Sequence, residues 1–137
     1  MLDSSVLTKW YVNEQDSALA ISLQQHFIDN KIQLIIADLS LFEVANALRY
    51  SGLFTTDDIL TAMEALQALG MPCLGYEEQI FNRAVQLSAD CAIAIYDSYL
   101  VALAEQQSID FITADGKLLR KVFHLPFVYD LRLYKIY

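Results

Sequence analysis

Hydrophobic and polar positions along the chain follow two periods, one typical of strands and one typical of helices. Residues 33–37 (QLIIA) form a short apolar run bounded by polar residues, as expected of a buried parallel strand. Residues 38–50 instead carry apolar side chains at helical spacing, and Gly52 follows as a stop signal. Short apolar runs therefore alternate with amphipathic helices in this part of the chain.

The same alternation continues over the whole sequence, with no internal repeat or linker to divide it. The pattern predicts strands at residues 1–2, 33–37, 72–76, 110–113 and 127–129. It predicts helices at residues 16–27, 38–50, 59–69, 78–88, 97–107 and 117–123. Strands separated by helices indicate an α/β fold, in which a parallel sheet carries helices on both faces. We expect one domain spanning residues 1–137.

Composition narrows the class of protein. Hydrophobic residues make up 55% of the 137 residues and charged residues 19%, compared with about 45–50% and about 25% in typical soluble domains. These values exclude a disordered chain and favour a surface that a partner partly covers. With 4 Gly and 2 Pro, the chain has little of the turn chemistry that an all-β protein needs.

The longest apolar stretch, residues 87–104, is not expected to cross a membrane. It contains Asp90 and Asp97, and each would cost about 3 kcal/mol at the centre of a membrane helix. No basic region follows Met1, so no signal peptide is predicted. These features predict a soluble, cytoplasmic protein with no membrane partner.

The charge is uneven along the chain. Seventeen acids and nine bases give a net charge of −8, which excludes passive attraction of nucleic acid or of an anionic membrane. Residues 1–115 contain 16 acids and 4 bases, a net charge of −12, whereas residues 116–137 contain 5 bases and 1 acid, a net charge of +4. The two His and two Cys residues are too few and too far apart for a zinc pattern.

Four acids are expected at one edge of the predicted sheet. Asp3 ends the first strand, and Asp115 follows the strand at 110–113. Glu43 lies one turn into the helix after the second strand, and Asp97 begins the helix before the fourth. Because functional groups collect at the carboxyl ends of parallel strands, these carboxylates should converge. A hard divalent cation, Mg²⁺ or Mn²⁺, would relieve their mutual repulsion.

Helix capping is the alternative reading of each acid taken singly. Residues 40–43 (SLFE) match the S-x-x-E capping box, Asp97 and Asp115 each precede a predicted helix, and Asp3 is placed to cap the helix after it. Capping does not explain why four acids fall at the same edge of one sheet.

Four segments together resemble the successive motifs of PIN-domain ribonucleases, and in particular the VapC-like toxins of bacterial toxin–antitoxin pairs. They are residues 3–7 (DSSVL), 43–49 (EVANALR), 96–104 (YDSYLVALA) and 113–118 (TADGKL). Their order and spacing match over nearly the whole chain. Each motif alone is weak, but the second and third form a specific combination.

The resemblance implies a three-layer α/β/α sandwich around a central, mostly parallel sheet of about five strands. It also implies hydrolysis of RNA phosphodiester bonds assisted by Mg²⁺ or Mn²⁺. Asp3, Glu43 and Asp97 match the family's core acidic triad, and Asp115 matches its fourth, more variable acid. We expect Asp3 and Asp97 to ligate the principal metal, and Glu43 and Asp115 to hold a water, hold a second metal or orient the attacking hydroxide.

Further residues match supporting positions of the family. Ser5 and Thr113 match hydroxyl residues that position a carboxylate or water, and Asn46 matches a polar neighbour of Glu43. Ordinary hydrogen bonds at helix starts are the alternative for all three. Phosphate contacts are assigned to basic residues next to the motifs, with a solvated helix face as their alternative: Lys9, Arg49 and Lys117.

The resemblance also implies partners other than the RNA substrate, namely a second copy of the chain and a cognate antitoxin bound in an apolar groove. Candidate groove residues share the two-helix segment before the third predicted strand: Ile59, Leu60, Met63, Leu66 and Leu69. Burial in the core is the alternative for this set.

Two other functions stay open. A phosphoacceptor receiver domain has a similar length, but here Asp57 and Asp58 open a helix and the late strand ends in Thr113 rather than in Lys. An inactive PIN-like binding module is the second. Family members usually have several apolar residues before the first acid, whereas only Met1 and Leu2 precede Asp3 here. Either the start of the sequence is clipped or the central strand is short, and a frayed Asp3 would weaken metal binding.

Overall fold

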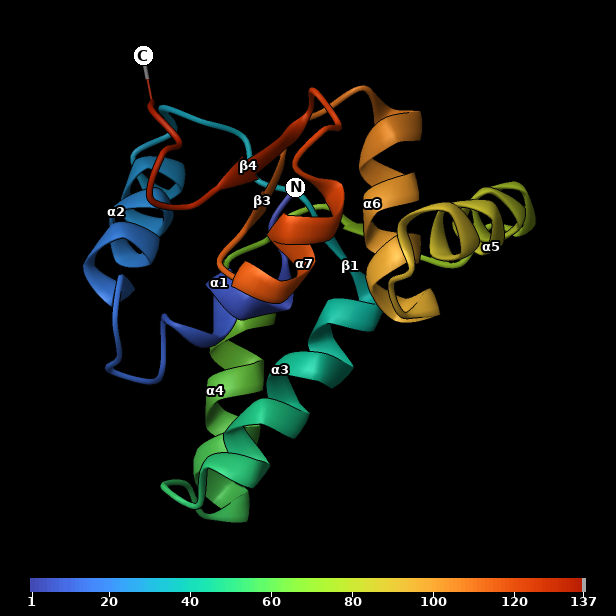
Figure 1. Cartoon of the computed structure of the whole chain (residues 1–137). Coiled ribbons are helices and arrows are strands. Elements are labelled where there is room, and N and C mark those ends of the chain that lie inside the picture. The colour runs from blue at the N-terminus through green and yellow to red at the C-terminus, as the bar shows by residue number, and fades with distance from the viewer. Residues whose placement is uncertain (137) are drawn as a thin grey trace.

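The structure is a computed structural model, and it describes residues 1–136. Its elements follow the predicted alternation of helices and short strands (Figure 1). In chain order they are α1 (Ser4–Thr8), α2 (Ser17–Ile28), β1 (Ile36–Ala37), α3 (Asp38–Ser51), α4 (Thr56–Ala68), β2 (Cys73–Leu74), α5 (Glu78–Cys91), α6 (Ile95–Gln107), β3 (Phe111–Thr113), α7 (Gly116–Val122) and β4 (Val128–Asp130).

The strands form two parallel pairs. β1 pairs with β2, and β3 pairs with β4. The start of the chain touches both pairs, because the Leu2 amide donates to the Ile35 carbonyl at 3.0 Å and the Asp3 amide donates to the Ile112 carbonyl at 3.0 Å. Leu2 also forms an isolated parallel bridge with Ile112. The parallel pairing that the sequence predicts is confirmed.

A continuous sheet of about five strands is not formed within residues 1–136. The predicted strands at 33–37 and 72–76 shorten to two residues each, β1 and β2. The predicted strand at residues 1–2 is reduced to the single bridge of Leu2. With two or three residues per strand, side-chain packing of the helices rather than a long ladder holds these segments together.

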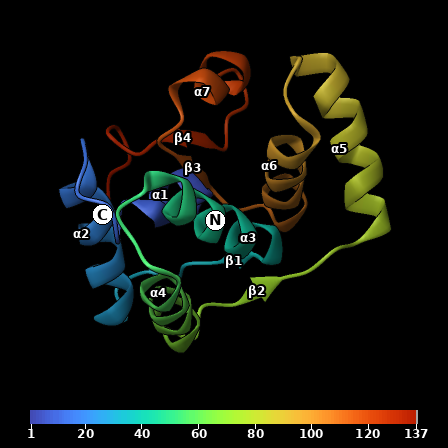
Figure 2. The same ribbon diagram turned by 90° about the horizontal axis from the view of Figure 1, so that it is seen from below.

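Alternate residues of the strands face two different hydrophobic clusters, as the period of a strand requires. Leu2 and Ile112 pack into a cluster with the helices α1 to α4, whereas Met1 and Phe111 pack into a cluster with α5 to α7. Figure 2 shows α2 and α4 on one side of the strands and α5 and α6 on the other. Helices therefore cover both faces, as the hydrophobic pattern predicts.

Local signals set the bounds of several helices. Thr55 and Asp58 form a reciprocal capping box at the start of α4, and Gly52 ends α3 in the left-handed conformation with φ of 70°.

Arg83 of α5 forms two hydrogen bonds, at 2.7 and 3.0 Å, to Glu105 of α6. This pair joins the two helices of the segment that carries Asp97.

No single helix within the described residues is both long enough and apolar enough to cross a membrane. The two helices α5 and α6 reach that length and composition only when they are taken together, across a bend of 117°.

Candidate active site

Three of the four predicted acids line one pocket at the carboxyl end of β3. Its volume is about 340 Å³. It is lined by residues from α1, from the loop after α1, and from α3, α6 and the β3–α7 loop: Asp3, Ser4, Ser5, Thr8, Lys9, Glu14, Ala47, Asp97, Ala114 and Asp115. Segments more than 90 residues apart in sequence thus bring carboxylates to a common space, which we call the acidic pocket.

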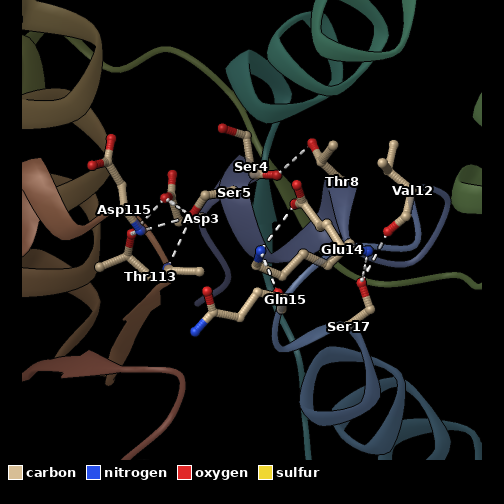
Figure 3. A network of polar contacts seen from close by, with 12 residues as sticks. Asp3, Ser4, Ser5, Thr8, Val12, Glu14, Gln15, Ser17, Thr113 and Asp115 are labelled. Carbon is tan, nitrogen blue, oxygen red and sulfur yellow. Dashed lines mark hydrogen bonds and ion pairs between the residues drawn. The ribbon is translucent and has the colours of Figure 1, made fainter. Parts of the chain in front are cut away.

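Asp3 is held firmly at the base of this pocket. Its exposed fraction is 4%, and its carboxylate accepts hydrogen bonds from the hydroxyls of Ser5 and of Thr113, the latter at 2.6 Å (Figure 3). Its amide is bonded to the Ile112 carbonyl. The expectation that a short first strand leaves Asp3 frayed is wrong, because contacts to β3 compensate for the missing ladder.

The two hydroxyls are themselves fixed by backbone amides. The Ser5 hydroxyl accepts from the Ala114 amide at 2.9 Å, and the Thr113 hydroxyl accepts from the Asp115 amide at 3.0 Å. Burial raises the pKa of Asp3, the hydrogen bonds from Ser5 and Thr113 lower it, and the charge of Asp115 raises it. The hydroxyls therefore favour the ionised form of a carboxylate that burial would otherwise neutralise.

Capping explains one of the four acids. Asp115 is the N-cap of α7, and its carboxylate accepts from the amides of Lys117 and Leu118 at 2.7 and 3.2 Å. Asp97 lies inside the first turn of α6, whose N-cap is Ala94. Asp3 occupies the N-cap position of α1, but its side chain makes no capping bond.

The capping box that was the alternative reading of residues 40–43 is absent. α3 begins at Asp38, with Ala37 as its N-cap, so Glu43 lies in the second turn of the helix. The start of α3 thus lies two residues before the predicted cap Ser40. Neither Glu43 nor Asp97 serves as a cap. Helix capping therefore does not explain why these acids lie near Asp3.

Glu43 and Asp97 both resist ionisation in this structure. Burial, with the charges of Asp3 and Asp97, raises the pKa of Glu43 from 4.5 to about 7, against a lowering contribution from the Ser4 hydroxyl. Burial, with the charges of Asp3 and Asp115, raises the pKa of Asp97 from 3.8 to about 6. Glu43 does not line the pocket itself, but these mutual effects place it within electrostatic reach of Asp3 and Asp97.

The donor set of the site fits a hard divalent cation. Glu43 Oε2 is buried without a hydrogen-bond partner, and the carboxylates raise one another's pKa. Carboxylate and water oxygens are the ligands that Mg²⁺ and Mn²⁺ prefer. As the side chains stand, no three Asp, Glu, His or Cys residues in positions 1–136 form a close metal-binding group. The fit thus rests on the chemistry of the donors and on the unpartnered oxygen.

One predicted supporting residue, Asn46, and one predicted phosphate contact, Arg49, lie elsewhere. Asn46 and Arg49 are exposed on α3 and line a groove of about 530 Å³ between α3 and α4, together with Phe54, Ile59 and Leu60. The structure therefore does not bring Asn46 or Arg49 to the acidic pocket. Ser5 and Thr113, in contrast, contact Asp3 directly.

The basic residues assigned to phosphate contacts differ in position. Lys117 is exposed on α7, two residues after Asp115. Lys9 lines the acidic pocket, and its ammonium is paired with Glu14. The Glu14 side chain is 46% exposed. A five-residue separation across an irregular loop gives no periodic signal, so this pair could be found only from the structure.

The protein is of the α/β class, with parallel strands and a pocket lined by carboxylates at the carboxyl end of β3. The chain belongs to the PIN domain family, whose model matches residues 1–123. This confirms the family that the motifs indicated. PIN domains are generally nucleases and typically bind divalent metals. No curated protein sequence matches the chain.

Solved structures share the fold over nearly the full length. A toxin–antitoxin complex from Klebsiella pneumoniae contains a chain with 16% identity and a TM-score of 0.69, with 98% of each chain covered. FitAcB from Neisseria gonorrhoeae has 18% identity and a TM-score of 0.68, covering 97% of this chain and 98% of that one. PAE2754 from Pyrobaculum aerophilum has 19% identity and a TM-score of 0.68, covering 96% and 89%.

The stability of the metal-free protein is expected to fall as the pH rises from 5 to 8. At low pH Glu43 and Asp97 are protonated in both the folded and the unfolded chain. Their folded pKa values of about 7 and about 6 exceed the ordinary 4.5 and 3.8, so a rise in pH ionises the unfolded chain first and stabilises it. With a discount for partial exposure, we expect a loss of about 1–3 kcal/mol.

Thermal unfolding in EDTA across this pH range measures the effect. Asp97→Asn should reduce the pH dependence, whereas Asp90→Asn, on the exposed side of α5, should leave it unchanged. A melting temperature that stays level or rises between pH 5 and 8 would contradict the raised pKa values.

Proposed function

We propose that this chain is a metal-dependent endoribonuclease that hydrolyses RNA phosphodiester bonds. The observation that carries the proposal is the convergence of Asp3, Asp97 and Asp115 in one pocket, with Glu43 near enough to share their charge effects. Membership of the PIN domain family supports the proposal, because PIN domains are generally nucleases. RNA as the substrate, and Mg²⁺ or Mn²⁺ as the metal, are part of the proposal.

In the proposed mechanism the four acids have separate tasks. Asp3 and Asp97 hold the metal, and Asp115 and Glu43 orient the attacking water or hold a second ion. When bound, the metal lowers the pKa of water and neutralises charge on the phosphate. Ser5 and Thr113 hold the carboxylate of Asp3 in place by the hydrogen bonds described above. The water oxygen bonds to phosphorus, the P–O3′ bond breaks, and the 3′ oxygen takes up a proton.

Hydrolysis of a labelled single-stranded RNA tests the proposal. The purified chain should cleave it with Mg²⁺ or Mn²⁺ and should stop when EDTA is added, and excess Mn²⁺ should restore cleavage. Equal cleavage with EDTA from the start would contradict a metal-dependent site. Calorimetric titration with Mn²⁺ separates the enzyme from an inactive PIN-like module, which should show no carboxylate-dependent binding.

We also propose that the chain is the toxin of a toxin–antitoxin pair and works in the cytoplasm. The likeness to a chain of a toxin–antitoxin complex supports this partner. The groove between α3 and α4 offers the antitoxin an apolar surface that includes Ile59 and Leu60. Within the helix α4, Leu66 is buried in the core, so it does not take part in this surface.

A homodimer is proposed on a second apolar surface. A hollow of about 250 Å³ lies between α3, α5 and α6, and it is lined largely by aromatic rings. Phe42, Tyr76 and Tyr96 there are 73%, 65% and 64% exposed, which is unusual for rings of this size in a monomer. Light scattering on the purified chain tests the dimer, and copurification with the product of a neighbouring gene tests the antitoxin.

A further inference from the structure

Lys9 carries the one positive charge among the described residues that line the acidic pocket. It directly follows α1, the short helix that begins after Asp3. Its side chain is 11% exposed, and its ammonium donates to Glu14 Oε1 at 2.9 Å and to the Gln15 carbonyl at 2.8 Å. A lysine in this position would otherwise be attracted to the nearby carboxylates and would compete with a cation for them.

Glu14 belongs to a loop that its own hydrogen bonds keep in shape. The Ser17 hydroxyl donates to the Val12 carbonyl at 2.9 Å and accepts from the Glu14 amide at 3.0 Å. Figure 3 shows Val12, Glu14 and Ser17 in this arrangement beside the residues of the pocket. The indole of Trp10 donates to the Ala20 carbonyl at 2.8 Å and so ties the start of the loop to α2. These bonds hold the backbone of Glu14 beside Lys9, and its carboxylate accepts from the Lys9 ammonium.

The ion pair of Lys31 and Asp29, which lies on the surface, serves as a comparison for the pair of Lys9 and Glu14. Lys31 and Asp29 are 3.0 Å apart, with side chains 59% and 37% exposed, and such surface pairs contribute little to stability. Lys9 differs from Lys31 in having two acceptors and a side chain only 11% exposed, whereas its partner Glu14, at 46%, is no more buried than Asp29. An ammonium has three N–H donors, so its two partners leave one donor for a ligand that enters the pocket.

We propose that the Lys9 ammonium binds a backbone phosphate of the RNA at the rim of the acidic pocket, and that Glu14 is a positioning residue that keeps it there. The inference rests on the proposed nuclease function. A phosphate oxygen accepts the remaining N–H of Lys9, while Glu14 and the Gln15 carbonyl hold the ammonium apart from Asp3 and Asp97. The rim then attracts the substrate without occupying the carboxylates that hold the metal.

Binding of a labelled single-stranded RNA tests the role of Lys9. It is measured in the Asp97→Asn background, so that cleavage does not consume the RNA. Lys9→Met should weaken binding about tenfold and should reduce the slope of log affinity against log salt by about 0.7, the value for one lost phosphate contact on a single strand. Lys31→Met removes the same charge from the exposed pair and should change neither quantity.

Cleavage kinetics test the role of Glu14 in the chain with Asp97 intact. Loss of an acid near the RNA should by charge alone tighten binding, whereas a positioning role predicts that Glu14→Gln raises KM about tenfold, as Lys9→Met does. Asp29→Asn is the matched control and should leave KM unchanged. Combining Glu14→Gln with Lys9→Met should add no loss beyond that of Lys9→Met, because both act through the same ammonium.

The outcomes separate this inference from the nuclease proposal. A wild-type chain that cleaves no RNA with Mg²⁺ or Mn²⁺ overturns the nuclease proposal and this inference with it. Wild-type cleavage with equal RNA binding by Lys9→Met and Lys31→Met overturns the role of Lys9 alone. Additive losses from the two pocket substitutions overturn the positioning role of Glu14. Lys9→Arg retains the charge and should retain the salt slope, and a lower slope would count against a phosphate contact.

Discussion

Replacement of Asp97 by asparagine is expected to abolish RNA cleavage while the protein stays folded. Asp97 lines the acidic pocket from the first turn of α6 and is coupled by charge to Asp3 and Asp115. An amide cannot supply the negative charge that a divalent cation needs from this position. Residues that only support metal ligands already cost about 10–100-fold when mutated, so the loss at a ligand should exceed about 100-fold.

The same substitution should preserve or raise stability, which distinguishes a functional residue from a structural one. Burial and neighbouring carboxylates raise the pKa of Asp97 to about 6, so its charge is unfavourable in the metal-free fold. Its loss should stabilise the chain at pH 8 by about 1 kcal/mol, after a discount for partial exposure.

Cleavage assays and thermal unfolding in EDTA measure the two effects of Asp97→Asn on the same samples. Asp90→Asn removes an exposed acid of α5 and should leave both quantities near wild type. Unfolding of Asp97→Asn would show that the residue has a structural role, and persistent cleavage would remove Asp97 from the site.

The fold was predictable from the sequence where periodicity and stop signals agree. Helix α3 was expected at residues 38–50 and spans Asp38–Ser51, with Gly52 as its left-handed end. Strand lengths were harder to predict, because apolar residues such as Leu34 are buried in the core without being part of a strand ladder. An apolar run reports burial, and burial in a helix-rich protein does not require a strand.

The candidate site was predictable to the extent that it depends on topology. The rule that strand ends share an edge placed Asp3 and Asp115 together, and the pocket contains both. Helix caps were harder to assign. The S-x-x-E pattern offered a cap at Ser40, but α3 begins at Asp38, as its periodicity predicts, with Ala37 as its N-cap.

Two hydrogen bonds of the site left no trace in the sequence pattern. Thr113 donates to Asp3 across 110 positions, and Glu14 accepts from Lys9 through a loop without regular spacing. The resemblance to the family identified Thr113, because Thr113 matches a hydroxyl position of the family's fourth motif. It gave no corresponding signal for Glu14, so the partner of Lys9 came from geometry alone.

Replacement of Thr113 by valine is expected to impair both cleavage and stability, unlike Asp97→Asn. Thr113 is fully buried, and its hydroxyl donates to Asp3 Oδ2 at 2.6 Å and accepts from the Asp115 amide at 3.0 Å. Valine keeps the shape but leaves a buried carboxylate with one hydroxyl donor fewer and an amide without its acceptor. We expect a loss of stability of about 1–3 kcal/mol and a fall in cleavage of about 10–100-fold.

The stability loss of Thr113→Val should depend on pH. The hydroxyl lowers the pKa of Asp3 against the effect of burial, so its removal penalises the ionised form and the deficit should grow as the pH rises. Thermal unfolding at pH 5 and pH 8, with cleavage at pH 8, measures both effects. Thr113→Ser retains the hydroxyl and should recover most of the cleavage, whereas Thr61→Val, on the exposed side of α4, should change neither property. Wild-type cleavage by Thr113→Val would show that Ser5 alone suffices to hold Asp3.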